Sequence, residues 1–194
     1  MKNYPPTPNL DLIESYLQKW DTLENYILQE NSLNLLFHKL CPENIKTEHI
    51  LLKVSSLNDF YSTNIYDTFT VAKHILNCEI DDSLSKGKLD IVNKIARVKI
   101  KKRTINFYSF ASKYCSHHNP AVYPIYDSYV EKMLMYFKRV EKFDTFLKDD
   151  LKDYPKFVEI IRNFQVYFHL GKFTLRQIDI YLWLAGKQYF PHKY

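Results

Sequence analysis

A lysine and an aspartate, fourteen residues apart, have the side-chain types and spacing best suited to catalysis in this sequence. Lys113 flanks an apolar helical stripe, and a lysine removed from water has a lowered pKa and becomes an amine nucleophile. Asp127 follows Pro124 at the start of the next predicted helix, where a carboxylate can cap the helix or face a site between two helices. Spacing alone favours the cap or an ion pair, so both roles of Asp127 stay open.

Two adjacent histidines follow Lys113 at the end of its predicted helix. His117 and His118 cannot both face one metal ion from a regular helix, so we predict no metal site and no cofactor. Hydrogen bonding to the last carbonyls of the helix is the simpler role, and contact with a phosphate is the alternative. Cys115 is predicted to be a core residue.

A basic stretch precedes this segment. Residues 85–103 contain eight lysines and arginines against one acid, an excess larger than the net charge of +5 for the whole chain. Such a concentration suits contact with the phosphates of DNA, although a charge run is also typical of a solvated helix face. The candidate DNA-binding residues are Lys99, Lys101, Lys102 and Arg103.

The composition favours a helical, cytoplasmic protein. The chain has 194 residues, 46% hydrophobic and 25% charged, with only three glycines, which leaves little room for tight hairpins. Three scattered cysteines indicate a reducing compartment rather than a disulfide framework. We expect no secretion and no membrane partner, because neither an apolar signal core nor a run of 18 apolar residues is present.

Hydrophobic spacing of three and four residues predicts an all-α fold with eight to ten helices. Asn9 and Thr174 are predicted to be N-caps, and Gly171 and Gly186 to be C-terminal caps. Residues 1–8 are expected to be a flexible lead, and residues 9–194 one helical domain, either undivided or formed by two lobes with a cleft. The predicted helices cover residues 9–20, 23–40 with a break near Asn31, 48–61, 67–77, 89–98, 104–117, 125–140, 156–170 and 174–185.

Three short motifs resemble the helix-hairpin-helix DNA glycosylase superfamily, the endonuclease III and 8-oxoguanine glycosylase group, over roughly residues 55–140. The segment 110–113 is similar to the G-x-K-[ST]-A setting of the catalytic lysine, and residues 126–130 with Leu134 are similar to the V-D-T-H-V motif. Residues 61–67 resemble L-S-x-Q-x-x-D, with Asn64 at the glutamine position. The family's L-P-G-[VI]-G hairpin and its four-cysteine cluster are absent, and residues 104–109 stand in the hairpin's place.

The resemblance implies a two-lobed helical fold and a base-removing activity on DNA. Lys113 would attack the sugar C1′ of an extruded nucleotide, Asp127 would stabilise the sugar cation, and Asn64 would fill the space left by the base. Two alternatives remain open. One is a nucleic-acid-binding module without catalysis that uses the same basic stretch. The other is a helical protein that binds other proteins or assists host defence.

Overall fold

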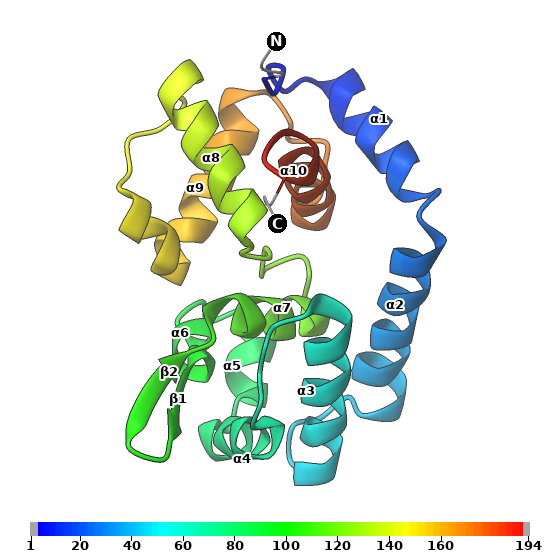
Figure 1. Cartoon of the computed structure of the whole chain (residues 1–194), viewed down its shortest axis with the longest axis vertical. Helices are drawn as coiled ribbons and strands as arrows, with labels where there is room; N and C mark the ends of the chain where they lie inside the picture. Colours follow the sequence, from blue (N-terminus) through cyan, green and yellow to red (C-terminus); the bar gives the residue numbers. More distant parts are fainter. Residues whose placement is uncertain (1–3, 192–194) are drawn as a thin grey trace. The chain divides into compact units, whose positions relative to one another are not determined.

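A computed structural model describes residues 4–191 and confirms the all-α fold, with one small sheet of two strands. The chain divides into two compact units (Figure 1). Unit 1 combines the residues up to Glu24 with those from Pro124 onward, and unit 2 comprises Asn25–Tyr123. Within residues 4–191, no helix has both the length and the apolar character needed to cross a membrane.

Unit 1 is a group of helices in which α10 (Leu175–Tyr189) packs against both α1 (Leu10–Trp20) and α8 (Ser128–Glu141). A short 3-10 helix, η2 (Lys148–Lys152), leads into α9 (Tyr154–Tyr167) and contacts it. An aromatic ring on α8 packs edge to face against the residue that follows α9, since Phe137 lies 5.6 Å from Phe168 between ring centroids. These contacts give unit 1 a hydrophobic core of its own.

Local capping signals in unit 1 were predicted well at helix starts and poorly at helix ends. Asn9 accepts a hydrogen bond from the backbone of α1, and Thr174 forms a capping box with Gln177, as expected. Gly186 is not a cap: it lies inside α10, where a Cβ would stand 2.6 Å from Cβ of Tyr129. Gly171 is not a cap either, because α9 ends at Tyr167, four residues earlier. Gly186 therefore allows α10 and α8 to pack closely at this point.

Residues 4–8 of the predicted flexible lead contact α8. The ring of Tyr4 stacks on Tyr136 at 6.3 Å, and the hydroxyl of Thr7 donates to Glu141 at 2.7 Å. The rest of that lead, residues 1–3, lies outside the described residues. The flexibility of the lead and a single domain with a cleft both stay predictions.

Unit 2 is a second helical group centred on α3 (Thr47–Tyr61), which packs against α4 (Thr68–Cys78) and α7 (Tyr108–His118). The predicted break near Asn31 is wrong, since α2 (Glu24–Leu35) runs through that residue and continues into a π-helical turn, η1 (Leu36–Leu40). Two short helices, α5 (Asp81–Ser85) and α6 (Ile91–Ala96), complete the unit's helices, and α6 packs on α7.

A β-hairpin stands where the sequence predicted the ends of two helices. Strands β1 (Arg97–Ile100) and β2 (Arg103–Asn106) pair antiparallel, so helix through residues 97–98 and 104–106 was a wrong prediction. The β-branched residues Val98, Ile100 and Ile105 alternate with polar residues, a pattern of period two that favours strands. Lys101 takes the left-handed backbone conformation of the turn, with φ of +54°, so no glycine was needed.

Candidate nucleic-acid interface

The hairpin has one face made only of polar side chains. Arg97 pairs with Asn106 and Lys99 pairs with Thr104, so these four side chains lie on the same side of the sheet. All four are exposed, as are Lys101 and Lys102 at the turn. Ten residues thus carry five cations and no acid, with hydrogen-bond donors between the charges. The arrangement suits a chain of phosphates.

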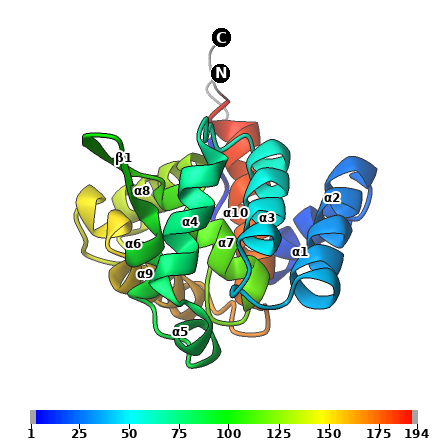
Figure 2. The same ribbon diagram turned by 90° about the horizontal axis from the view of Figure 1, so that it is seen from below.

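The hairpin lies against α4. β1 packs against α4, and Figure 2 shows the hairpin beside that helix. Two hydrogen bonds from Thr70 hold the pKa of Asp67, the N-cap of α4, below its usual range, and the positive charge of Lys101 lowers it further. The hairpin is therefore a neighbour of the helix that follows the α3–α4 loop.

The α3–α4 loop, residues 62–67, is fixed by one amide side chain. Asn58 accepts from the backbone N–H of Ile65 at 2.9 Å and from the hydroxyl of Thr63 at 2.8 Å. Its Nδ2 also donates to the carbonyl of Ile65 at 3.1 Å, and the Ile65 side chain is buried. The predicted strand-filling residue, Asn64, is exposed in this loop with φ of +58°. The loop is therefore held by its own hydrogen bonds.

This loop displays an aromatic ring. Tyr66 is 97% exposed, and Phe69, the second residue of α4, is 59% exposed. Buried Ile65 on one side and the Asp67 cap on the other fix the backbone that carries Tyr66. An aromatic ring next to a basic hairpin is a combination typical of nucleic-acid-binding surfaces. We call Tyr66, Phe69 and the hairpin residues 97–106 the hairpin surface.

Lys113 lies on a polar stripe of α7 that faces the end of α3. Its Nζ donates to Oγ of Ser109 at 2.6 Å and stands 5.4 Å from the ring centroid of Tyr61, the last residue of α3. His117, one turn further, places Nε2 3.1 Å from the hydroxyl of Tyr61. Lys113 and His117 are both buried. The stripe thus ends where the α3–α4 loop begins.

A second polar cluster, which the sequence did not reveal, lies inside unit 2. Lys53 is fully buried and donates to Oδ1 of Asn44 at 2.6 Å and to the carbonyl of Glu43 at 3.1 Å. Asn44 also accepts from the hydroxyl of Tyr114 at 2.5 Å. Burial away from water lowers the pKa of Lys53 from 10.5 to about 8, and the negative charge of Asp81 acts in the opposite direction and raises it. Lys53 is therefore a buried lysine with a lowered pKa.

His118 belongs to this second cluster. Its Nε2 faces Nδ2 of Asn44 at 3.2 Å and Nζ of Lys53 at 3.5 Å, so this nitrogen accepts and the ring is neutral. Burial and then the charge of Lys53 hold the pKa of His118 well below its usual range. The two adjacent histidines therefore have different partners: His117 contacts Tyr61, and His118 belongs to the Lys53 cluster. Their contact with DNA stays a prediction.

Asp127 acts as a helix cap in unit 1. Its Oδ1 accepts from the backbone N–H of Tyr129 at 2.9 Å at the start of α8. Lys113 belongs to unit 2, so the predicted pairing of the two residues stays a prediction. Cys115 is fully buried, and burial raises the pKa of its thiol, which makes it a core residue as expected. Among residues 4–191, no three His, Cys, Asp or Glu side chains gather as a metal site requires.

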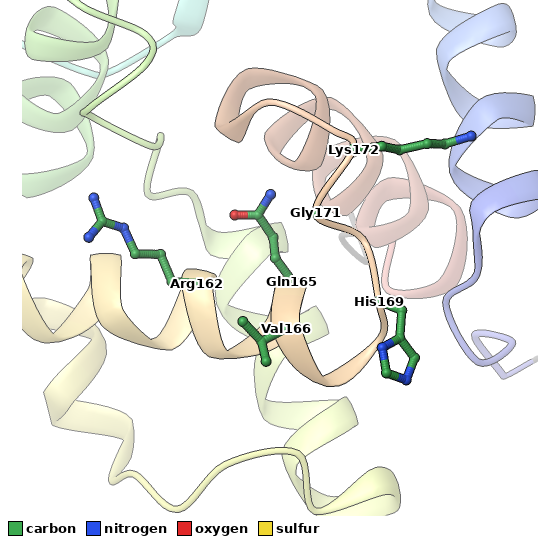
Figure 3. Close-up of a pocket in the computed structure, with 6 residues that line it drawn as sticks. All are labelled: Arg162, Gln165, Val166, His169, Gly171 and Lys172. Atoms are coloured by element: carbon green, nitrogen blue, oxygen red, sulfur yellow. The ribbon is translucent and has the colours of Figure 1, made fainter.

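An open depression of about 580 Å³ lies at the end of α9 in unit 1 (Figure 3). Arg162, Gln165 and Val166 come from α9, and His169 and Lys172 come from the segment that follows it. Figure 3 shows Arg162 and His169 pointing away from each other, and Lys172 pairs with Glu14 at 2.5 Å. The cations do not converge on one point, so the hairpin surface is the better candidate site.

Fold and site together define an all-α protein that carries a basic β-hairpin beside a displayed aromatic ring. The chain belongs to the family HI_0787_N, described as an N-terminal domain, whose model matches residues 12–122. It is 47% identical over 145 residues to an uncharacterized protein of Haemophilus influenzae, with 74% of this chain and 69% of the relative covered. No solved structure matches the chain significantly. The family match ends one residue before the boundary of unit 2, so it includes the whole hairpin surface.

Proposed function

We propose that this protein binds DNA through the hairpin surface. The observation that carries the proposal is a ten-residue hairpin with five cations, no acid and one wholly polar face. Lysine and arginine at such a face neutralise phosphates and release the counterions that surround DNA, which drives binding without regard to sequence. A cytoplasmic location is part of the proposal, since all three cysteines are buried free thiols and fit a reducing compartment.

A triple variant of the hairpin tests this proposal. Lys99→Gln, Lys101→Gly and Lys102→Gln remove three charges, and glycine suits the left-handed backbone of residue 101, so the turn is retained. The matched control removes three exposed lysines away from the hairpin through Lys39→Gln and Lys46→Gln in unit 2 and Lys152→Gln in unit 1. Both variants have the same net charge.

The measurement is the affinity for a labelled DNA over a range of salt concentrations. For duplex DNA, the slope of log affinity against log salt is about −0.9 for each neutralised phosphate. The hairpin variant is expected to bind more weakly and to lose up to about 0.9 of slope per lysine, while the control keeps the slope of the wild type. Equal losses in the two variants, or no binding by the wild type, would contradict the proposal.

Base removal by a glycosylase-like reaction is the second candidate function, favoured by the position of Lys113. Its amine is buried next to Tyr61 and Ser109, and lysine nucleophiles of enzymes commonly act from such sheltered sites. In the proposed step, Nζ forms a bond to the sugar C1′ as the bond from C1′ to the base breaks. The departing base takes up a proton, and the carboxylate of Asp127 offsets the positive charge on the sugar. Asn64, His117 and His118 would contact the strand.

Trapping with borohydride tests this second candidate. A covalent adduct between the protein and DNA containing a damaged base is expected for the wild type and for Lys94→Ala, and not for Lys113→Ala. Full base release by Lys113→Ala would refute the role assigned to Lys113. Absence of an adduct with all three proteins would refute catalysis and leave DNA binding as the only proposed function. A protein recovered as partner, without any change in DNA mobility, would favour the protein-interaction alternative.

A further inference from the structure

We infer that the hairpin surface takes an unpaired nucleotide, with its base stacked on Tyr66, and therefore prefers single-stranded DNA to duplex. The inference rests on the proposed DNA binding and adds the class of DNA. It follows from three properties of the described residues: the exposure of Tyr66, the hydrogen bonds that hold its loop and the packing of the basic hairpin against α4.

The side chain of Tyr66 is exposed to solvent and is not covered by other side chains. It is 97% exposed, and Phe69, three residues further along the chain, is 59% exposed. Aromatic rings usually contribute to cores, because burial of their large apolar surface is favourable. Two such rings, three residues apart in the chain, leave apolar surface that a partner can cover. A nucleobase has a matching flat face on both sides.

The loop presents Tyr66 at a fixed position. Asn58 makes three hydrogen bonds to Thr63 and Ile65, and the Ile65 side chain is buried. Asp67 then anchors the chain to Thr70 through two further hydrogen bonds, of 3.0 and 2.8 Å. Because the backbone on both sides of Tyr66 is held, binding requires little ordering of the loop, which favours affinity.

The basic turn supplies the charge that selects a nucleotide over another flat molecule. β1 packs against α4, and Asp67, the residue next to Tyr66, is the N-cap of that helix, so a strand that stacks a base on the ring can extend its phosphates along the hairpin. Lys102 and Arg103 continue the positive surface along the hairpin. The carboxylate of Asp67 repels phosphate, but the five cations of residues 97–106 outnumber it.

Duplex DNA cannot use the ring in the same way. In a duplex both faces of each base are covered by neighbouring bases, so a protruding side chain reaches only the edges. An unpaired base leaves a face free, and stacking on an aromatic side chain is then available whatever the base. The hairpin alone would bind duplex and single strands by their phosphates, and Tyr66 adds a contact that only the unpaired nucleotide makes.

The experiment compares three labelled DNAs by fluorescence anisotropy: a single strand of mixed sequence, its duplex, and the duplex with one unpaired nucleotide in a bulge. The proteins are the wild type, Tyr66→Ala, Tyr66→Phe and Tyr66→Leu. Since residue 66 is exposed, these substitutions are expected to leave the fold intact, which circular dichroism checks. Phenylalanine keeps the aromatic face, and leucine keeps apolar area without it.

The wild type is expected to bind the single strand and the bulged duplex at least about tenfold more tightly than the plain duplex. Tyr66→Ala should lose about 5- to 150-fold on the single strand, with no change on the plain duplex. Tyr66→Phe should behave as the wild type and Tyr66→Leu as the alanine variant. Equal binding of single strand and duplex, or wild-type affinity of Tyr66→Ala, overturns the inference while leaving the proposed DNA binding in place. Absence of binding to all three DNAs overturns both.

Discussion

The buried Lys53 predicts an unusual dependence of stability on pH. Removal of water lowers the pKa of this lysine from 10.5 to about 8, so the folded state disfavours the charged amine. Between these two pH values the unfolded chain binds a proton that the folded chain does not. The free energy of unfolding therefore rises with pH across this window, and this gain in stability is lost again as pH falls toward 8.

The size of the effect follows from the shift. A change of one pKa unit corresponds to about 1.4 kcal/mol, so lowering the pKa from 10.5 to about 8 costs about 3 kcal/mol at pH 7. About 2 kcal/mol of this cost should be relieved on reaching about pH 9.5. Above that value the buried tyrosines act in the opposite direction, because burial raises their pKa in the folded state.

Urea unfolding of the wild type and Lys53→Met, at several pH values between 7 and about 9.5, measures the contribution. Methionine keeps the length of the side chain without the charge, and Asn44 retains its hydrogen bond from Tyr114. The stability of the wild type should rise by about 2 kcal/mol relative to Lys53→Met. The control Lys46→Met changes an exposed lysine nearby and should track the wild type. Parallel curves for wild type and Lys53→Met would refute the reasoning.

Two further changes test the packing and the acid stability of the units. Gly186→Ala should destabilise by about 1–3 kcal/mol, because its Cβ would meet Tyr129 at 2.6 Å, whereas Gly171→Ala, with nothing within 4 Å, should leave the melting temperature nearly unchanged. Burial holds the pKa of His118 well below 6.5, so the stability of the folded chain should fall as pH drops below 6.5. Urea unfolding should show that His118→Gln reduces this loss of stability, whereas the control His169→Gln, at an exposed position, does not. Equal melting temperatures of the glycine variants, or equal acid sensitivity of the histidine variants, would contradict these assignments.

The sequence predicted those helices whose signals are local. Asn9 and Thr174 accept hydrogen bonds within their own helices, so the residues that define each cap are three positions apart. The hairpin was not predicted, because the small number of glycines in the sequence argued against tight turns. Lys101 nevertheless adopts a left-handed backbone, at a cost that the paired strands offset.

The Lys53 cluster escaped prediction because its partners are distant in sequence. Lys53 lies three residues after Ile50 and four before Leu57, on the buried face of α3, and that spacing was a usable signal. The hydrogen bond between its acceptor Asn44 and Tyr114 spans 70 residues, so no local spacing indicates it. Tyr66 was read as part of a motif, since no sequence pattern distinguishes a displayed tyrosine from a buried one.

The long reach of Asn44 has a consequence for the order in which unit 2 forms during synthesis. Asp81 and Tyr114 both bond to Asn44, and His118 faces it, so three of its partners are made 37 to 74 residues later. Until α7 has left the ribosome, Asn44 lacks Tyr114 and His118, so burial of its polar side chain would cost free energy. The core of unit 2 therefore closes only when its last helix arrives, and a nascent chain that ends before α7 holds helices without a finished interior.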